Sequence, residues 1–150
     1  LKRVPLPHLS VAQADALDQP ITVAEVISAI SKLKTLKAPG PNGFSALFYK
    51  IYCRERAPVL ARLYNSIREA GETTTSMLMA AIKVLPKPGR DPTLCSSYRP
   101  ISLINVDAKL LTSILAAGLG ELMPMLIDPD QSGFIGGETA QITPKVCSTW

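Results

Sequence analysis

The segment of residues 85–105, LPKPGRDPTLCSSYRPISLIN, constrains the fold most strongly. A loop rich in proline, glycine and serine lies there between two short apolar runs, AIKVL at its start and ISLI near its end. Runs of this length bounded by turn residues are typical of strands, so we predict strands over 82–85 and 100–104. Because proline stiffens the loop, the loop can hold its side chains in a defined place between the two strands.

This loop is cationic. It carries Lys87, Arg90 and Arg99 against a single acid, Asp91. Lysine and arginine form their strongest hydrogen bonds with ionised acceptors such as phosphate, so cations held between two strands suit a polyphosphate ligand. The spacing alone is also compatible with solvated loop cations that bind nothing, and this interpretation stays open.

Helical patterns dominate the remainder of the chain. Thr22 and Glu25 form a capping box, and apolar residues follow at helical spacing. Pro39 cannot continue a helix, so this helix must end by Ala38. Residues 1–20 show little periodicity and are predicted to be an irregular lead-in.

Three further helices are predicted from apolar spacing and from the positions of capping residues, prolines and glycines: 45–56, 58–70 and 105–123. Leu47, Phe48 and Ile51 are expected to face inward in the first. Pro58 is expected to start the second, and Gly71 to stop it. Asn105 is the expected N-cap of the third, whose predicted buried face consists of Val106, Leu110, Leu111, Ile114, Leu115, Leu119 and Leu122. The predicted class is α+β, mostly helical.

Composition limits the possible partners. A net charge of +4 and a pI near 9.1 are compatible with nucleic acid. An aromatic content of 5% argues against a broad base-stacking surface. The three cysteines stand apart and His8 is the single histidine, which argues against a zinc site and favours an intracellular location, nuclear or cytoplasmic. No apolar run approaches the ~20 residues of a membrane span, so no membrane partner is expected.

Four sequence blocks, in order, resemble the reverse transcriptases of LINE-type (non-LTR) retrotransposons. The run PKPGRDP…YRPISLIN is similar to PKPGKDP…YRPISLLN in the fingers of that family, and KAPGPNGF at 37–44 is similar to KAPGPDGF. INVDAKLLTSILAAGL at 104–119 is similar to LNVDYKILAKILANRL, and PDQSGFIGG at 129–137 is similar to PDQSGFIPGR. The resemblance covers residues 21–137, which is most of the chain.

The resemblance implies part of a right-hand polymerase. Residues 21–75 would form a helical N-terminal extension, and residues 76–137 the fingers part of a reverse transcriptase domain. The irregular lead-in, 1–20, would precede them, and an unassigned tail, 138–150, would follow. The palm would be missing, so the implied fold is an incomplete right-hand polymerase within the α+β class.

Site residues follow from the same resemblance. In the family, a lysine and an arginine of the fingers close over the triphosphate of the incoming dNTP, which implies that role for Lys87 and Arg99. The residues implied in the vicinity of the template or nucleotide are Arg90, Lys109, Gln131, Gly133 and Phe134. A simpler interpretation stays open for these five residues. Arg90 and Lys109 would be surface cations, and Gln131, Gly133 and Phe134 would form a turn in which the phenylalanine packs into the core.

The catalytic carboxylates of the family have no counterpart among the aspartates of this sequence. The aspartates of this chain are never adjacent, and none lies in a palm motif. We therefore assign no catalytic or metal-binding residue, and expect the fragment alone to be inactive. The full-length enzyme is expected to use Mg²⁺, an RNA template, a DNA primer and dNTP, together with the remaining palm and thumb.

Departures from the family leave a second function open. Asn42 stands where the family has Asp, and Gly118 and Glu138 stand where it has Arg. Two lost arginines remove charge that would face phosphate. The chain also begins without a methionine, which suggests an excerpt or a gene fragment. The alternative is a non-enzymatic retrotransposon remnant, or a helical module with weak nonspecific nucleic-acid binding.

Overall fold

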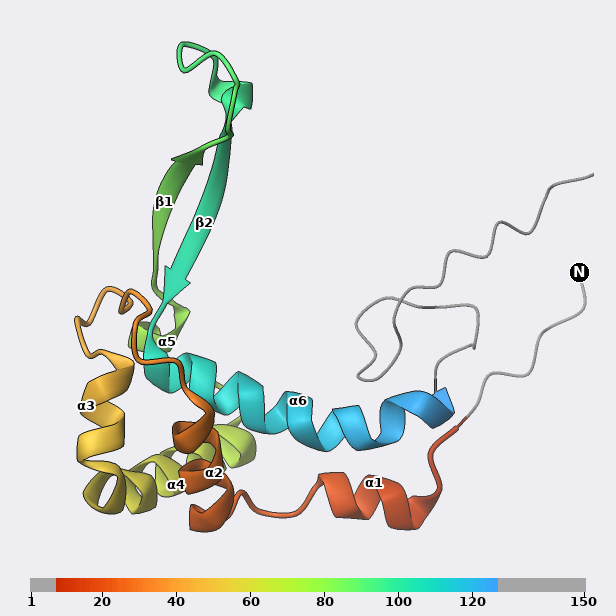
Figure 1. The fold of residues 1–150 in the computed structure, drawn as a ribbon. Helices are drawn as coiled ribbons and strands as arrows, with labels where there is room; N and C mark the ends of the chain where they lie inside the picture. The colour runs from red at the N-terminus through yellow and green to blue at the C-terminus, as the bar shows by residue number, and fades with distance from the viewer. Residues whose placement is uncertain (1–7, 127–150) are drawn as a thin grey trace, which may run out of the picture. The chain divides into compact units, whose positions relative to one another are not determined.

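The computed structural model describes residues 8–126, and most of them are helical (Figure 1). The elements follow in the order α1 (Val11–Leu17), α2 (Val23–Lys32), α3 (Ala46–Ile51), α4 (Cys53–Ala70), α5 (Thr75–Leu78), β1 (Ala80–Pro86), a 3₁₀ turn (Cys95–Ser97), β2 (Tyr98–Ile104) and α6 (Val106–Leu126). The mostly helical α+β class is therefore confirmed, with β1 and β2 as a small antiparallel sheet. The chain divides into two compact units, Pro20–Leu115 and, among the described residues, 8–19 together with 116–126.

The core of the unit Pro20–Leu115 is built by α2, α3, α4 and the first part of α6. Its largest fully buried side chains are Tyr64, Ile30, Leu110, Val26 and Asn105. The Tyr64 hydroxyl donates a hydrogen bond to the carbonyl oxygen of Asp107 at 2.8 Å. The polar tip of this buried ring is therefore satisfied where α4 meets α6.

The beginning of α2 is held against α4. Asn65 accepts a hydrogen bond from the Ile21 N–H and donates one to the Ile21 carbonyl oxygen, both at 2.8 Å. The capping box of Thr22 and Glu25 then starts α2, as the sequence predicts. The helix ends at Lys32, well before the prolines that limit it.

The prediction of an irregular lead-in over 1–20 is wrong for Val11–Leu17, which form α1. The Ser10 hydroxyl accepts a hydrogen bond from the Gln13 N–H at 3.3 Å, and the Gln13 side-chain oxygen accepts one from the Ser10 N–H at 2.9 Å. This pair is a capping box with glutamine as its second member. The signal is present in the sequence, but weak apolar periodicity hides it.

The helix boundary predicted at Pro58 is also wrong. α4 already begins at Cys53 and passes through Pro58. A proline removes one intrahelical hydrogen bond, and here it does so near the helix start, so α4 continues. Gly71 ends α4 in the left-handed conformation, with φ of 71°, as predicted.

The inward face predicted for the helix near residue 45 needs correction. Leu47 and Ile51 are 51% and 64% exposed. Ala46 and Tyr49 are buried instead, and Phe48 packs partly against the core. Since α3 has only six residues, its periodicity is too short to determine its buried face, and packing against α2 and α4 decides it.

β1 and β2 form a hairpin that extends the strands predicted over 82–85 and 100–104. The register pairs Lys83 with Ile101 and Leu85 with Arg99. Every residue of β1 is exposed, and most of β2 is exposed as well. Neither face of the hairpin is therefore covered by the described residues.

Asn105 joins three segments. It is 1% exposed, and its side-chain oxygen accepts a hydrogen bond from the Asn42 N–H at 3.1 Å. Its side-chain nitrogen donates to the Ser76 carbonyl oxygen at 2.8 Å. Its own carbonyl oxygen accepts from the Lys109 N–H, as an N-cap residue does. The side chain thus links the turn at 37–44 and α5 to the start of α6.

α6 runs to Leu126, beyond the predicted end at Met123, and contains Pro124. Leu115 and Leu119 are 56% and 44% exposed, so the predicted buried face is wrong for these residues, which lie past the buried core positions of the helix. Within the described residues, α6 alone is long and apolar enough to cross a membrane by length and composition. Its first turns contribute to the protein core, so this test alone does not assign a membrane, and the expected absence of a membrane partner stays a prediction.

Gly40→Ala should destabilise the protein by about 2 kcal/mol, because the added methyl group would overpack the close contact between Gly40 and Asn105. A Cβ at Gly40 would lie 2.6 Å from the Cα of Asn105 and would also meet its side-chain oxygen. Gly120→Ala is the matched control, since a Cβ there meets nothing within 4 Å and alanine favours the helix by up to ~1 kcal/mol. Urea unfolding measures both; equal changes for the two variants would contradict the packing of Gly40 on Asn105.

Stability should fall as pH rises above ~10, the ordinary tyrosine pKa. Burial raises the pKa of Tyr49 to about 12, with the Asp107 charge adding to the effect, and burial also raises the pKa of Tyr64. Because the folded-state pKa exceeds the unfolded one, the contribution is complete below ~10 and is lost above it. Tyr64→Phe should cost ~1 kcal/mol at pH 7 and flatten the alkaline loss. Thermal midpoints from pH 7 to 11 check this, and an unchanged alkaline slope in the variant would refute it.

Candidate functional site

The hairpin places three cations on one of its faces. Successive residues of a strand alternate between faces, so Lys83, Leu85 and Lys87 share a face. Arg99 belongs to this face because it pairs with Leu85. Lys83 and Lys87 are each diagonal neighbours of Arg99, at roughly 7–8 Å between backbones, a distance that long side chains can span. These three residues are named the cationic face below.

A hollow of about 440 Å³ lies at the tip of the hairpin. Its lining residues are Lys87, Gly89, Arg90, Asp91, Leu94, Ser96 and Ser97. Gly89 has φ of 68°, a left-handed conformation that glycine adopts without strain and that turns the loop at this point. The hollow thus combines two cations with serine side chains and backbone polar groups.

Lys87 is tied to the wall of this hollow. Its N–H donates to the Ser97 carbonyl oxygen at 2.7 Å, which continues the hairpin ladder by one pair. Its ammonium group donates to the Ser96 carbonyl oxygen at 2.8 Å. An ammonium group has three donors, so two protons of Lys87 remain for a ligand after this bond.

Asp91 is the single acid of residues 80–104. Its side-chain oxygen accepts hydrogen bonds from the Thr93 hydroxyl at 2.7 Å and from the Thr93 N–H at 2.9 Å. These bonds, the side-chain one first, lower the pKa of Asp91 below its ordinary value, so the group is ionised at neutral pH. Lys83, Lys87, Arg90 and Arg99 oppose this one charge, so the hairpin is strongly cationic.

The structure brings some of the sequence-predicted residues together. Lys87 and Arg90 line the hollow, whereas Arg99 is absent from its lining and lies on the strand face beside Lys87. Lys109 is half-buried in the first turn of α6, outside the hairpin. The predicted residues Gln131, Gly133 and Phe134 lie outside the described part of the chain.

Sequence reasoning missed Lys83. This residue lies in β1, and its place on the cationic face follows from the two-residue alternation between Lys83 and Lys87. The signal was therefore present in the sequence. The alternation alone does not place Lys83 beside Arg99, because that also requires the register of the two strands. A shift by one residue would move Lys83 to the opposite face relative to Arg99.

The described residues do not fit the magnesium ion that the resemblance implies. Among residues 8–126, no group of three or more His, Cys, Asp or Glu side chains is placed to hold a metal ion. Cys53 and Cys95 are free cysteines. We therefore derive no metal-dependent step from these residues.

Comparison with known proteins gives the family. No protein-family model matches the chain. The chain is 30% identical over 134 residues to the transposon TX1 uncharacterized 149 kDa protein of Xenopus laevis, covering 89% of this chain and 10% of that protein. It is 32% identical over 123 residues to the probable RNA-directed DNA polymerase from transposon BS of Drosophila melanogaster, covering 81% of this chain and 14% of that protein.

A third relative is also an RNA-directed DNA polymerase by name. The chain is 32% identical over 96 residues to the RNA-directed DNA polymerase from mobile element jockey of Drosophila funebris, covering 64% of this chain and 10% of that protein. The chain spans about a tenth to a seventh of the length of these relatives. It therefore belongs to the family of non-LTR retrotransposon proteins that includes these RNA-directed DNA polymerases.

Proposed function

We propose that this chain is a segment of a retrotransposon reverse transcriptase and that its hairpin contacts the triphosphate of the incoming dNTP. The full protein would copy an RNA template from a DNA primer, with Mg²⁺ bound by residues other than those described. The remaining palm and thumb would be its partners within that protein. The described residues would contribute charge and position rather than the chemical step.

The cationic face carries this proposal. Lys83, Lys87 and Arg99 lie on one side of a ribbon that no described residue covers, and the one nearby carboxylate is at the loop. Arginine can grip two phosphate oxygens with its planar fork, whereas lysine acts as a point charge. An elongated polyphosphate fits a row of cations along a ribbon better than a compact anion does.

The hollow supplies a second part of the same surface. Lys87 belongs to both the hollow and the cationic face, so its position is central. Its bond to the Ser96 carbonyl oxygen restricts the side chain before any ligand arrives, which reduces the entropy lost on binding. Arg90 in the hollow, and Lys109 on α6, would reach template phosphates, as would the region of Gln131, Gly133 and Phe134.

Arg99→Ala should weaken binding of dTTP and of inorganic tripolyphosphate by about tenfold, because a charge-assisted contact is lost. Arg62→Ala is the matched control, an exposed cation of α4 away from the hairpin, and should change affinity less than about twofold. Isothermal titration at two salt concentrations measures both variants and the wild type. Equal losses for the two variants, or binding insensitive to salt, would favour the remnant with nonspecific affinity.

The purified chain should give no primer extension with a primed RNA template, dNTPs and Mg²⁺. The expectation follows because two-metal catalysis needs clustered carboxylates, and residues 8–126 contain no such cluster. Gel analysis of a labelled primer is the measurement, with an active reverse transcriptase as positive control. Extension above the no-protein background would overturn the claim that catalysis needs parts of the protein beyond this segment.

A further inference from the structure

The turn at 37–44 contains the dipeptide Asn42-Gly43, which differs chemically from the surroundings of the other asparagines. The sequence has three asparagines, Asn42, Asn65 and Asn105, and only Asn42 precedes a glycine. Asparagine is thermolabile, because the backbone nitrogen of the next residue can attack its side-chain amide. A glycine in that next position places no side chain in the way of the attack. The sequence therefore distinguishes Asn42 from the other two.

Gly43 is open to solvent. It is exposed, and a Cβ built on it would meet nothing within 4 Å. Its N–H donates a hydrogen bond to the Gly40 carbonyl oxygen at 3.0 Å, and this bond has to open before the nitrogen can react. Exposed turns of this kind open locally at little cost in free energy. The nitrogen of Gly43 is therefore within reach of water and base.

The Asn42 side chain is held beside the nitrogen that would attack it. Its Oδ1 accepts a hydrogen bond from the Phe44 N–H at 3.1 Å, and the ring closed by this bond contains both Asn42 Cγ and the Gly43 nitrogen. The same N–H would stabilise the negative charge that develops on Oδ1 during attack, as an oxyanion-hole donor does. The Nδ2 of Asn42 has no hydrogen-bond partner among the described residues, so it can depart without breaking a contact.

The other two asparagines lack this arrangement. Asn65 lies within α4, and both its side-chain oxygen and its side-chain nitrogen are bonded to the backbone of Ile21. Asn105 is 1% exposed, and its side chain is bonded to the Asn42 N–H and to the Ser76 carbonyl oxygen. At both positions, departure of the side-chain nitrogen would break a bond between separate segments. Asn65 and Asn105 are therefore internal controls for Asn42.

We propose that Asn42 is a site of spontaneous deamidation in the folded protein. The Gly43 nitrogen bonds to Asn42 Cγ, the bond from Cγ to Nδ2 breaks, and the Gly43 amide proton leaves with Nδ2 as ammonia. The product is a cyclic succinimide, which water opens at either of its carbonyl carbons. Opening at Cγ gives aspartate at position 42, and opening at the main-chain carbonyl carbon gives isoaspartate. Water is the sole co-reactant, and the inference does not rest on the proposed function.

The aspartyl product fits the turn. Its backbone is unchanged, and its carboxylate can accept the Phe44 N–H in the way that the amide oxygen does. The Asn42 N–H is bonded to Asn105, the residue directly before α6, and the start of a helix favours negative charge. The fold around the turn therefore accommodates a carboxylate at this position.

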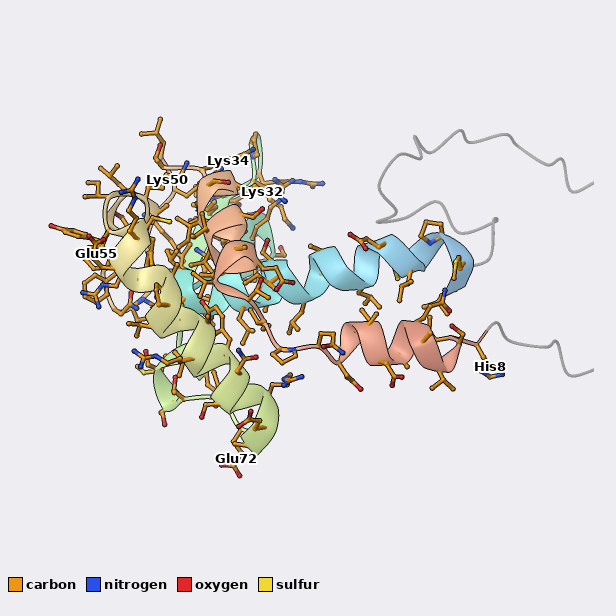
Figure 2. The ribbon with its side chains drawn as sticks, turned by 90° about the horizontal axis from the view of Figure 1, so that it is seen from below. His8, Lys32, Lys34, Lys50, Glu55 and Glu72 are labelled. Atoms are coloured by element: carbon orange, nitrogen blue, oxygen red, sulfur yellow. The ribbon has the colours of Figure 1, made fainter. Side chains whose placement is uncertain are left out.

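Few acids oppose the new charge. No Asp or Glu occurs over residues 26–54, which include the turn and α3. Figure 2 shows Glu55 and Glu72 toward the two ends of α4, and the six residues of α3 separate Glu55 from the turn along the chain. Asp107 lies in the first turn of α6, two residues beyond Asn105. The like charge that a new carboxylate has to tolerate is therefore chiefly that of Asp107.

The isoaspartyl product does not fit the turn. Its main chain runs through Cβ and Cγ of residue 42, so the turn gains a backbone atom. The bond between the Gly43 N–H and the Gly40 carbonyl oxygen would then span a longer segment. Because Gly40 packs directly on Asn105, a longer turn disturbs the contact at the start of α6. Aged molecules would thus divide into stable aspartyl and destabilised isoaspartyl forms.

The test ages the whole folded chain in mildly alkaline buffer made with oxygen-18 water and then digests it with trypsin in ordinary water. Trypsin places the three asparagines in separate peptides, because basic residues lie between them. Mass spectrometry should show the Asn42 peptide gaining an acid group that contains oxygen-18, about tenfold or more faster than the Asn65 and Asn105 peptides. Asn42→Gln is the matched control and should keep its amide over the same period, because its longer side chain cannot form the succinimide ring.

Two results would overturn the proposal. Conversion of Asn42 in the urea-unfolded chain but not in the folded chain would show that the turn bond from Gly43 to Gly40 protects the site. Conversion of Asn42 no faster than that of Asn65 in the folded chain would show that neither the glycine nor the turn selects it.

Thermal unfolding tests the fit of the two products. Asn42→Asp should unfold at or above the wild-type temperature, because it keeps the turn and its hydrogen bonds. The isoaspartyl fraction, separated from aged protein by ion-exchange chromatography, should unfold at a lower temperature than Asn42→Asp. A lower midpoint for Asn42→Asp than for the wild type, or equal midpoints for the two products, would refute the assigned fit.

Discussion

The buried amide of Asn105 is the interaction on which the rest of the unit Pro20–Leu115 depends. A buried polar group costs free energy unless its hydrogen bonds are made, so this side chain requires its partners to be in place. Those partners are the Asn42 N–H in the turn at 37–44 and the Ser76 carbonyl oxygen in α5. Asn105 itself lies between β2 and α6. One side chain therefore fixes where the hairpin leaves the helices and where α6 begins.

The same constraint explains the composition of the turn. Gly40 is needed because the backbone of Asn105 comes too close for any Cβ there. Gly43 adopts φ of 77°, and the Asn42 side chain accepts a hydrogen bond from the Phe44 N–H at 3.1 Å. The turn that resembles the family motif therefore has a structural role, because it packs against Asn105 at the start of α6. It ends at Phe44, directly before Ser45, the N-cap of α3.

Two groups of side chains stay exposed outside the core. The hairpin contributes almost nothing to the core, and its cations are exposed on a ribbon with uncovered faces. At α3, Phe44 and Tyr52 are likewise 47% and 49% exposed, whereas Tyr49 is buried in the core. Exposed apolar and cationic groups of this kind are costly or neutral for a free domain, and they are typical of surfaces that contact a partner.

The sequence by itself predicted several features correctly: the capping box of Thr22, the end of α4 at Gly71, the two strands around the cationic loop and the α+β class. Tertiary contacts alone decided the buried face of α3 and the exposure of Leu115, because packing between elements outweighs short periodicity and single-residue propensity. The candidate site was likewise predicted from the sequence only in part. The sequence named Lys87, Arg90 and Arg99, but only the strand register could join Lys83 to Arg99, since which cations share a face depends on how two distant segments pair.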